Sequence, residues 1–333
     1  MPESGRFRHG LIVGKFAPPH AGHEALIRFA LERCETLSVW VYSRPDFTAM
    51  PSPLRRGWLR EVFPVWLFPN LELLPDAPNP PLNDAPDQVH QDYVRRVLGD
   101  WNIRPDAVFS SEDYGPALAG RLNAAHVPFD PERRLSPISG SAVRQDVHAA
   151  RQYLSPLVYA HFVQRVALVG AESTGKSTLA AALAGAFGTR FVREYGRDVY
   201  ERENGALHPE HFAEIALGHR ALEDEAIRAP GLNRFLFADT TAATTLMWSY
   251  LLTRTALSEL HALADACAAR YAHTFLCGDE FRHVQDGWRS NTEVRGVQQA
   301  FIIQDLRSRG VPFTELRGPL DERLATVRGV LEQ

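Results

Sequence analysis

The sequence predicts two consecutive α/β domains, each built on a doubly wound parallel sheet. The chain has 333 residues, too many for one ordinary core and suited to two domains of about 150 residues each. In both halves, short apolar segments with β character alternate with segments of helical periodicity. Another apolar strand candidate near the middle of the chain, at 166–170, indicates where a second sheet begins. We therefore place the domains at 1–162 and 163–333.

The first half contains three strand candidates, at 10–13, 37–42 and 107–110. A helix is predicted from Gly22 to about Cys34, because apolar residues recur there at three- and four-residue spacing. The segment 75–87 holds five prolines, which exclude a helix or a central strand. It must be a loop, and its length suits a substrate-covering segment and a plain surface connection equally.

The second half begins after a stretch of helical pattern that covers 144–165. Besides the strand at 166–170 and a second strand just before Arg193, strand candidates lie at 234–239, 274–277 and 312–316. Helices are predicted between them, at 178–186, 211–229 and 294–308.

Composition limits the possible functions. The formal charge of -4 and pI of about 6.4 argue against the positive field that nucleic-acid binding relies on. The three cysteines have no metal-ligand spacing and their odd number fits no disulfide framework. No apolar run approaches the roughly 18 to 20 residues of a membrane helix, and the start has no signal-peptide core. We expect a cytoplasmic protein with reduced thiols that binds neither nucleic acid nor membrane.

The segment GKFAPPHAGH, at 14–23, places His20 and His23 between a strand and a helix. Gly22 leaves room for a phosphate near the backbone, and the helix N-terminus offers free N–H groups. Two imidazoles there can donate hydrogen bonds to a phosphate whose charge grows in the transition state. The alternative is a turn histidine beside a helix-capping histidine.

Two further segments of the first half carry polar residues that suit a nucleotide. In ISGSAVR, at 138–144, Ser139 and Ser141 supply hydroxyls and Arg144 a forked cation suited to phosphate. An ordinary Ser-capped helix with a surface arginine explains this segment equally well. SSEDYG, at 110–115, directly follows a strand, where open α/β sheets place ligands. RRGWL, at 55–59, is a weaker candidate for a ligand-contacting segment, and a helix with a buried Trp58 explains it nearly as well.

The second half begins with GAESTGKS at 170–177, which matches the phosphate-loop pattern at every specified position. It follows an apolar strand and precedes an Ala/Leu-rich helix, which is the context that the pattern requires. The loop N–H groups can surround a β-phosphate, Lys176 can reach the β- and γ-phosphates, and the Ser177 hydroxyl can complete a Mg²⁺ shell.

Acidic residues suited to phosphoryl transfer follow two strands of the second half. Asp239 ends the apolar run 235–239, where a carboxylate can hold Mg²⁺. In REYGRD, at 193–198, a carboxylate can accept the proton of a substrate hydroxyl; we favour Glu194, with Asp198 as the competitor. An acidic first helical turn explains this segment without any function. The segment 281–290 suits a mobile lid in which Arg289 closes on ATP phosphates.

With both motif sets in this order, the chain resembles the bifunctional nicotinamide-nucleotide adenylyltransferase and ribosylnicotinamide kinase family. GKFAPPHAGH resembles the HxGH signature of the nucleotidyltransferase superfamily, and ISGSAVR its second motif, except that Gly140 replaces the usual serine. The likeness also covers SSEDYG, GAESTGKS, REYGRD, ALGHR at 216–220, FADTTAATT and QDGWRS at 285–290. Some members begin with a helix-turn-helix repressor module of roughly 50 residues, for which we expect no room before the first strand.

The resemblance implies a two-step route to NAD. The second domain would phosphorylate nicotinamide riboside with ATP to give the mononucleotide NMN, and the first would transfer the adenylyl group of a second ATP to it. Mg²⁺ would serve both steps. The implied catalytic residues are His20, His23, Lys176, Glu194 and Asp239, with Ser177 and Asp239 on the metal. The implied ATP contacts are Gly14, Lys15, Phe16, His20, Gly22, His23, Ser139, Ser141 and Arg144 in the first domain, and Gly170, Ala171, Glu172, Ser173, Thr174, Gly175, Lys176, Ser177, Thr178 and Arg289 in the second. The implied substrate contacts are Ser111, Glu112, Tyr114, Glu194, Tyr195, Asp198, Asp239 and Asp286.

Two alternatives and two questions stay open at this stage. A fused phosphopantetheine adenylyltransferase and dephospho-coenzyme A kinase would have the same motif order, and a regulator could sense nucleotides through degenerate sites. The sequence does not settle whether the chain forms a homo-oligomer. It also does not rank the aromatic residues that could stack on a nicotinamide ring, namely Trp40, Trp58, Trp101, Tyr114 and Tyr195.

Overall fold

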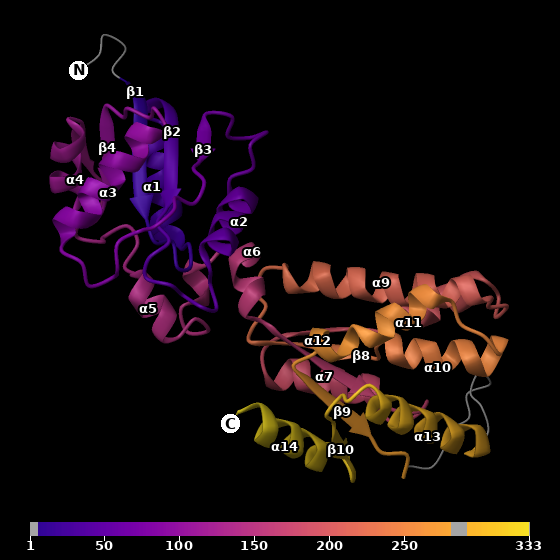
Figure 1. Cartoon of the computed structure of the whole chain (residues 1–333). Helices are drawn as coiled ribbons and strands as arrows, with labels where there is room; N and C mark the ends of the chain where they lie inside the picture. Colours follow the sequence, from indigo (N-terminus) through magenta and orange to yellow (C-terminus); the bar gives the residue numbers. More distant parts are fainter. Residues whose placement is uncertain (1–5, 281–291, 333) are drawn as a thin grey trace. The chain divides into compact units, whose positions relative to one another are not determined.

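The structure, a computed structural model that describes residues 6–280 and 292–332, divides the chain into two compact units (Figure 1). They are Met1–His161 and Phe162–Gln333, so the division lies one residue before the predicted boundary. Each unit contains one five-stranded parallel sheet, which gives the predicted α/β fold class.

The sheet of the first unit has the strand order β3-β2-β1-β4-β5. Its strands are β1 (Phe7–Gly14), β2 (Cys34–Val41), β3 (Leu71–Leu73), β4 (Ala107–Ser110) and β5 (Ala125–Pro128). The chain adds strands on one side of β1 and then on the other, so the connections diverge between β1 and β4. Open α/β sheets bind ligands at such a point, beyond the carboxyl ends of the strands.

Helices cover both faces of this sheet, as the alternation of side chains along the strands requires. Ile12 of β1 and Phe109 of β4 pack with α1 (Ala21–Leu31) and α2 (Ser52–Val62). Leu11 of β1 and Val108 of β4 pack on the opposite face with α3 (Asp87–Asp100) and α4 (Gly115–Leu122). The short helices α5 (Gly140–Gln145) and α6 (Pro156–Tyr159) follow β5.

The sheet of the second unit has the order β10-β9-β6-β8-β7. Its strands are β6 (Gln164–Val169), β7 (Arg190–Val192), β8 (Phe235–Asp239), β9 (His273–Cys277) and β10 (Thr314–Leu316). β6 lies in the centre between β8 and β9, so the loop after β6 is flanked by the carboxyl ends of both neighbours.

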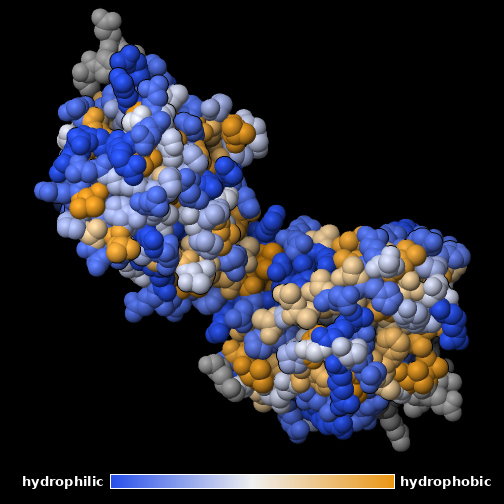
Figure 2. Space-filling model, in the orientation of Figure 1, coloured by the Kyte–Doolittle hydropathy of each residue, from blue (hydrophilic) through white to orange (hydrophobic). Residues whose placement is uncertain are grey.

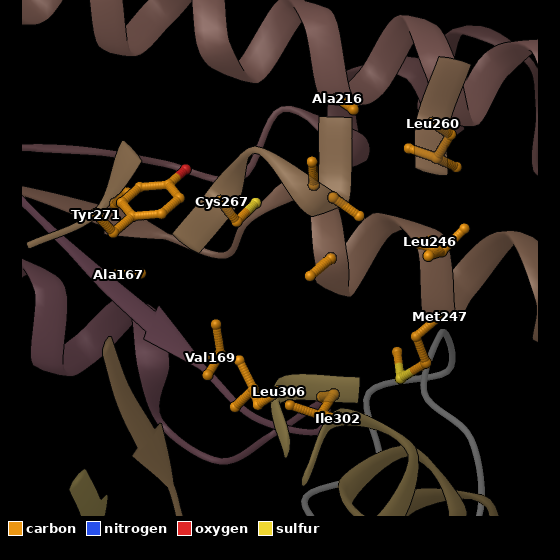
Figure 3. Close-up of a cluster of buried hydrophobic side chains, with 14 of the residues drawn as sticks. Ala167, Val169, Ala216, Leu246, Met247, Leu260, Cys267, Tyr271, Ile302 and Leu306 are labelled. Atoms are coloured by element: carbon orange, nitrogen blue, oxygen red, sulfur yellow. The ribbon is translucent and has the colours of Figure 1, made fainter. Parts of the chain in front are cut away.

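Two layers of helices cover the second sheet as well. One core joins Ala167 and Val169 of β6 to α9 (Pro209–Ile227), α10 (Ala242–Thr253) and α13 (Thr292–Ser308), as Figure 3 shows for part of the cluster. The opposite face packs on α7 (Lys176–Ala186) and α14 (Leu320–Leu331). The remaining helices are α8 (Gly196–Arg202), α11 (Ser258–Asp265) and α12 (Cys267–Arg270).

Two local predictions are wrong, and two strands were not predicted. Cys34 does not end the first helix but begins β2. The helical pattern of 144–165 breaks into short pieces, because the Asp146 carboxylate accepts the N–H groups of His148 and Ala149 in a turn. The strands β3 and β5 were not predicted; they have only three and four residues, too few to show a period.

The surface of both units is mostly hydrophilic in the view of Figure 2, with apolar residues scattered singly or in small groups. Among the residues that the structure describes, no helix is long and apolar enough to span a membrane.

Candidate active sites

A cavity of about 480 Å³ opens at the carboxyl ends of the strands of the first unit. Every candidate site residue predicted for the first domain lines it: Gly14, Lys15, Phe16, His20, Gly22, His23, Ser111, Glu112, Tyr114, Ser139, Ser141 and Arg144. The structure therefore brings together three segments, 14–23, 110–115 and 138–144, that lie far apart in the sequence.

Hydrogen bonds to the backbone orient the two imidazoles of the cavity. His20 is the N-cap of α1, and its Nδ1 accepts the N–H of Gly22 at 3.2 Å. Nδ1 of His23 accepts the N–H of His20 at 3.3 Å. Since each Nδ1 is an acceptor, a neutral ring must carry its proton on Nε2. Both Nε2–H groups are then available as donors, and the ring centroids lie 3.8 Å apart.

The two histidines are held neutral. Burial lowers the pKa of His20 to about 4, with further contributions from the nearby cations Arg133 and Arg144. Burial also lowers the pKa of His23 well below its usual value, and His20 and both arginines add to this effect. The site at neutral pH thus presents hydrogen-bond donors from the imidazoles and positive charge from the arginines.

Arg144 is fixed beside the histidines by two hydrogen bonds. Its guanidinium donates to the Ala17 carbonyl at 2.8 Å and to the Ser141 hydroxyl at 2.9 Å. A Cβ added at Gly140 would lie 3.2 Å from the Arg144 guanidinium and 4.0 Å from Nε2 of His20. Glycine here therefore keeps the space between the arginine and the imidazole open. Ser139 caps α5 by accepting the N–H of Ala142, as the alternative explanation of this segment predicted.

The segment 110–115 is packed closely against β1 and β5. The Tyr114 hydroxyl donates to the carbonyl of Val13, and Ser110 hydrogen-bonds to His126 at 3.0 Å. A Cβ at Gly115 would lie 1.9 Å from the Ser110 hydroxyl, so no other residue fits this position without rearrangement. This explains why a glycine follows Tyr114.

Several other residues line the same cavity and carry no signal in the sequence that predicts it. Arg133 is among them; it pairs with Glu112 at 3.0 Å, and nothing in its sequence context indicates a ligand. His90, for which the sequence shows no partner pattern, also lines the cavity and hydrogen-bonds to Tyr42 at 2.7 Å. Asn83 and other residues of the proline-rich segment 75–87 contribute to the lining, so this segment is more than a surface connection.

Arg55 has a supporting role beneath the cavity. Its side chain is buried and donates to the carbonyls of Lys15, Tyr42 and Ser43. It thereby ties the turn after β1 to the turn after β2. Trp58 is buried, as predicted, and its ring packs edge-on against His161.

In the second unit, residues 170–175 form the turn between β6 and α7, and Lys176 and Ser177 begin the helix. Gly170 has a φ of 145°, and a Cβ there would lie 2.7 Å from the Cys277 carbonyl. Gly175 has a φ of 81° and is the N-cap of α7. The Lys176 ammonium donates to the carbonyls of Gly170 and Ala171 at 3.0 and 2.7 Å, so it lies across the turn. Both glycines occupy conformations that other residues rarely adopt.

Ser177 and Asp239 lie together at the carboxyl end of the sheet. The Ser177 hydroxyl donates to one carboxylate oxygen of the buried Asp239 at 2.5 Å. The other oxygen, Oδ1, is buried and has no hydrogen-bond partner among the residues that the structure describes. A hydroxyl beside an unsatisfied carboxylate oxygen fits the oxygen ligands that Mg²⁺ prefers.

The structure separates the two candidate bases. Asp198 forms a bidentate ion pair with the exposed Arg193, at 2.7 and 2.8 Å, and this bond lowers its pKa. Glu194 instead lies near Lys176 and Asp239. Burial raises its pKa, partly offset by the Lys176 charge. A raised pKa suits a carboxylate that must take up a proton, whereas the ion pair of Asp198 opposes it.

Contact with Tyr195 accounts for the glycine in the ALGHR segment. A Cβ at Gly218 would lie 2.3 Å from the Tyr195 ring, so this glycine of α9 makes room for the tyrosine. The next residue, His219, is buried in the same helix, 3.3 Å from Glu223, and is a packing residue. Of the other predicted residues, Thr178 lies in the first turn of α7, and Asp286 and Arg289 fall outside the residues that the structure describes.

The structure reduces the number of aromatic residues that could stack on a nicotinamide ring. Trp40 and Trp58 are buried in the cores, and Trp101 packs against Trp40 at a centroid distance of 5.2 Å. Tyr114 lines the cavity, and so do the aromatic residues Phe16, Tyr42 and Phe129, of which only Phe16 was predicted to lie at the site.

The fold and these sites define a class: a two-unit α/β protein with a phosphate-loop domain. A family model for the AAA domain matches residues 165–323. The chain is 28% identical over 325 residues to the trifunctional NAD biosynthesis/regulator protein NadR of Escherichia coli (strain K12), across 92% of this chain and 78% of that protein. NadR of Salmonella typhimurium (strain LT2) is 27% identical over 326 residues, with the same coverage.

Two solved structures have the same fold over nearly the whole chain. One is a NadR protein in complex with NAD and AMP-PNP, with a TM-score of 0.72, 20% identity, and coverage of 98% of this chain and 96% of that one. The other is a NadR protein in complex with NR, with a TM-score of 0.73, 19% identity, and coverage of 98% and 95%. The chain is therefore a homologue of the NadR proteins, which confirms the family resemblance of its motifs.

Proposed function

We propose that the chain is a bifunctional enzyme that phosphorylates nicotinamide riboside in its second unit and converts the resulting mononucleotide to NAD in its first. The observation that carries this proposal is the grouping of all the predicted first-domain residues around one cavity, together with a separate phosphate loop in the second unit. The homology to NadR, a NAD biosynthesis protein, supports the choice of substrates.

In the first unit, a phosphate oxygen of the mononucleotide would attack the α-phosphorus of ATP. The bond from that phosphorus to the bridging oxygen breaks, and pyrophosphate leaves with its electron pair. The attacking group is already an anion, so no protein nucleophile is needed. The Nε2–H groups of His20 and His23 would donate to the α-phosphate as its charge grows, and Arg144 and Lys15 would balance the charge of the triphosphate.

In the second unit, the 5'-hydroxyl of the riboside would attack the γ-phosphorus of ATP while Glu194 accepts its proton. The bond to the β-γ bridging oxygen breaks, and ADP leaves. Lys176 would shift from the loop carbonyls to the β- and γ-phosphates. Ser177 and Asp239 would hold Mg²⁺, whose charge would offset that of the phosphates.

The activities can be separated by two variants. We expect Lys176→Ala to abolish riboside phosphorylation and to leave NAD formation from the mononucleotide almost intact, since the two sites share no described residue. His23→Ala should have the opposite effect. Loss of both activities in either well-folded variant would contradict the assignment.

The chain also allows direct labelling, because its sequence contains only two lysines, Lys15 and Lys176. Each lies in one of the two proposed ATP sites. An acyl phosphate of ATP, which transfers its acyl group to nearby amines, should therefore label both lysines, and excess ATP should protect both. Labelling of one lysine alone would reduce the proposal to a single ATP site.

The choice of substrate distinguishes the alternatives. Purified protein should phosphorylate nicotinamide riboside and not dephospho-coenzyme A; turnover of the second compound alone would favour the coenzyme A route. Nucleotide binding without turnover of either substrate would favour a sensor.

A further inference from the structure

The phosphate loop is held by two adjacent glutamines that the proposed mechanism does not use. The side-chain oxygen of Gln299 accepts the N–H of Ala171 at 2.9 Å, and that of Gln298 accepts the N–H of Glu172 at 3.0 Å. Both glutamines belong to α13 and are buried. The first two N–H groups after Gly170 thus donate to helix α13.

Gln299 also connects the loop to the sheet. Its amide nitrogen donates to the carbonyl of Cys277, the last residue of β9, at 3.0 Å. The two hydrogen bonds fix the orientation of the amide, because one end must accept and the other must donate. Glutamine meets this requirement, whereas a carboxylate would have no proton for the carbonyl.

The far end of the loop is held from a different helix. Arg323 of α14 is buried and donates to the Thr174 carbonyl at 2.7 Å and to the Gly278 carbonyl at 3.2 Å. Its charge is paired with Glu280 at 2.9 Å. The loop is therefore tied at its start to α13 and near its end to α14.

These contacts have a consequence for anion binding. A backbone N–H that donates to a glutamine is not free for a phosphate, so the N–H groups of Ala171 and Glu172 serve the shape of the loop. A phosphate would then meet the later part of a turn that is already formed. Preorganisation of this kind increases affinity, because less ordering accompanies binding.

We infer that Gln298 and Gln299 are positioning residues of the phosphate-transfer site, which act by holding the phosphate loop in its anion-binding shape. The identity of the phosphorylated substrate rests on the proposed function, but the effect on nucleotide affinity does not.

Methionine substitutions test the inference, since methionine is similar in size to glutamine and lacks the amide. Gln298→Met and Gln299→Met are compared with Gln304→Met, a control in the same helix at an exposed position. Three quantities are measured on the full chain: ADP affinity by calorimetry, thermal unfolding, and hydrogen exchange of the backbone N–H groups without nucleotide.

We expect each buried substitution to weaken ADP binding roughly tenfold, as the loss of one hydrogen bond to a buried donor implies. Exchange should accelerate at Glu172 in Gln298→Met and at Ala171 in Gln299→Met, and the control should change neither. Folded variants that bind ADP like the wild type would overturn the inference, whatever their melting temperature.

One more variant covers the case in which the methionine variants do not fold. Gln298→Glu keeps an oxygen for the N–H of Glu172, so slow exchange should persist there; fast exchange at Glu172 would overturn the inference. If these results hold while nicotinamide riboside is not phosphorylated, the proposed function fails and the positioning role stands.

Discussion

The two candidate phosphate sites are fixed in different ways. In the first unit, the histidines are oriented by hydrogen bonds between residues two and three positions apart, from Gly22 to His20 and from His20 to His23. In the second unit, the phosphate loop is held by side chains 126, 128 and 149 positions away, on Gln298, Gln299 and Arg323. The orientation of the two imidazoles is therefore set locally, whereas the shape of the phosphate loop depends on the completed fold.

The difference has physical consequences. A local site costs little chain entropy to assemble, but its shape depends on side chains that can move. A site held by distant residues forms only when the whole unit is folded. A larger side chain introduced there then clashes with backbone atoms that cannot move. Substitutions at the imidazole pair should therefore mainly reduce activity, and substitutions at the phosphate loop should also reduce stability.

The largest effect is expected for Asp239→Asn, which removes the carboxylate charge at the proposed metal site. Riboside phosphorylation should fall on the order of a thousandfold, because a metal supplies several kcal/mol of charge stabilisation in such reactions. Initial rates at increasing Mg²⁺ concentration would measure it, with NAD formation as the internal control. A rate close to that of the wild type would contradict the proposed role of Asp239 at the metal site.

Substituting alanine for one glycine at each site compares the phosphate loop with the imidazole pair directly. At Gly170 the added Cβ would lie 2.7 Å from the Cys277 carbonyl at a φ of 145°, so Gly170→Ala should cost roughly 2 to 3 kcal/mol of stability. At Gly22 the Cβ would lie 3.2 Å from the His20 ring and 3.3 Å from the Ser136 hydroxyl, which can shift. Gly22→Ala should cost less than about 1 kcal/mol and should slow NAD formation by displacing His20.

Denaturant unfolding and the two activity assays would measure both effects. Gly185→Ala is the control, because a Cβ there meets nothing within 4 Å and lies within α7. Equal losses of stability at Gly170 and Gly22 would contradict the distinction between the two sites.

A further effect, smaller than those at Asp239 and Gly170, is a dependence of stability on pH in the first unit. The pKa of His20 is lowered to about 4 in the folded state, from a usual value near 6.5, so the unfolded chain binds a proton first. The contribution of His20 is complete above pH 6.5 and is lost as the pH falls towards 4. Between pH 7.5 and 5.5 the first unit should lose about 1 kcal/mol through this group.

Thermal unfolding followed at both pH values would measure this loss, with His20→Gln as the reference, because glutamine does not titrate. The same pH dependence in the variant would assign the effect to other groups.

The local origin of the histidine site explains why the sequence was informative there. His20, Gly22 and His23 stand within four residues, so their spacing alone places two imidazoles at a helix N-terminus. The phosphate loop is equally compact in sequence, from Gly170 to Ser177. In both cases a strand, a turn and a helix follow each other directly, and local patterns predict such units well.

Other features could not be found in this way. Arg133 and His90 reach the cavity from a loop and a helix whose own patterns carry no signal. Sequence reasoning left Glu194 and Asp198 as competitors, four positions apart in one segment. The structure distinguishes their surroundings, because Arg193 pairs with Asp198 while Glu194 lies near Lys176.

The sequence by itself determined the α/β fold class, and it predicted a change of unit near residue 162 and the short segments proposed to carry phosphate chemistry, since each depends on residues close together in the chain. Only the tertiary structure decided which distant residues complete each site, including Arg133 in the first unit and Gln298, Gln299 and Arg323 in the second. The physical reason is that these contacts join elements over a hundred positions apart, and no local period or spacing records them.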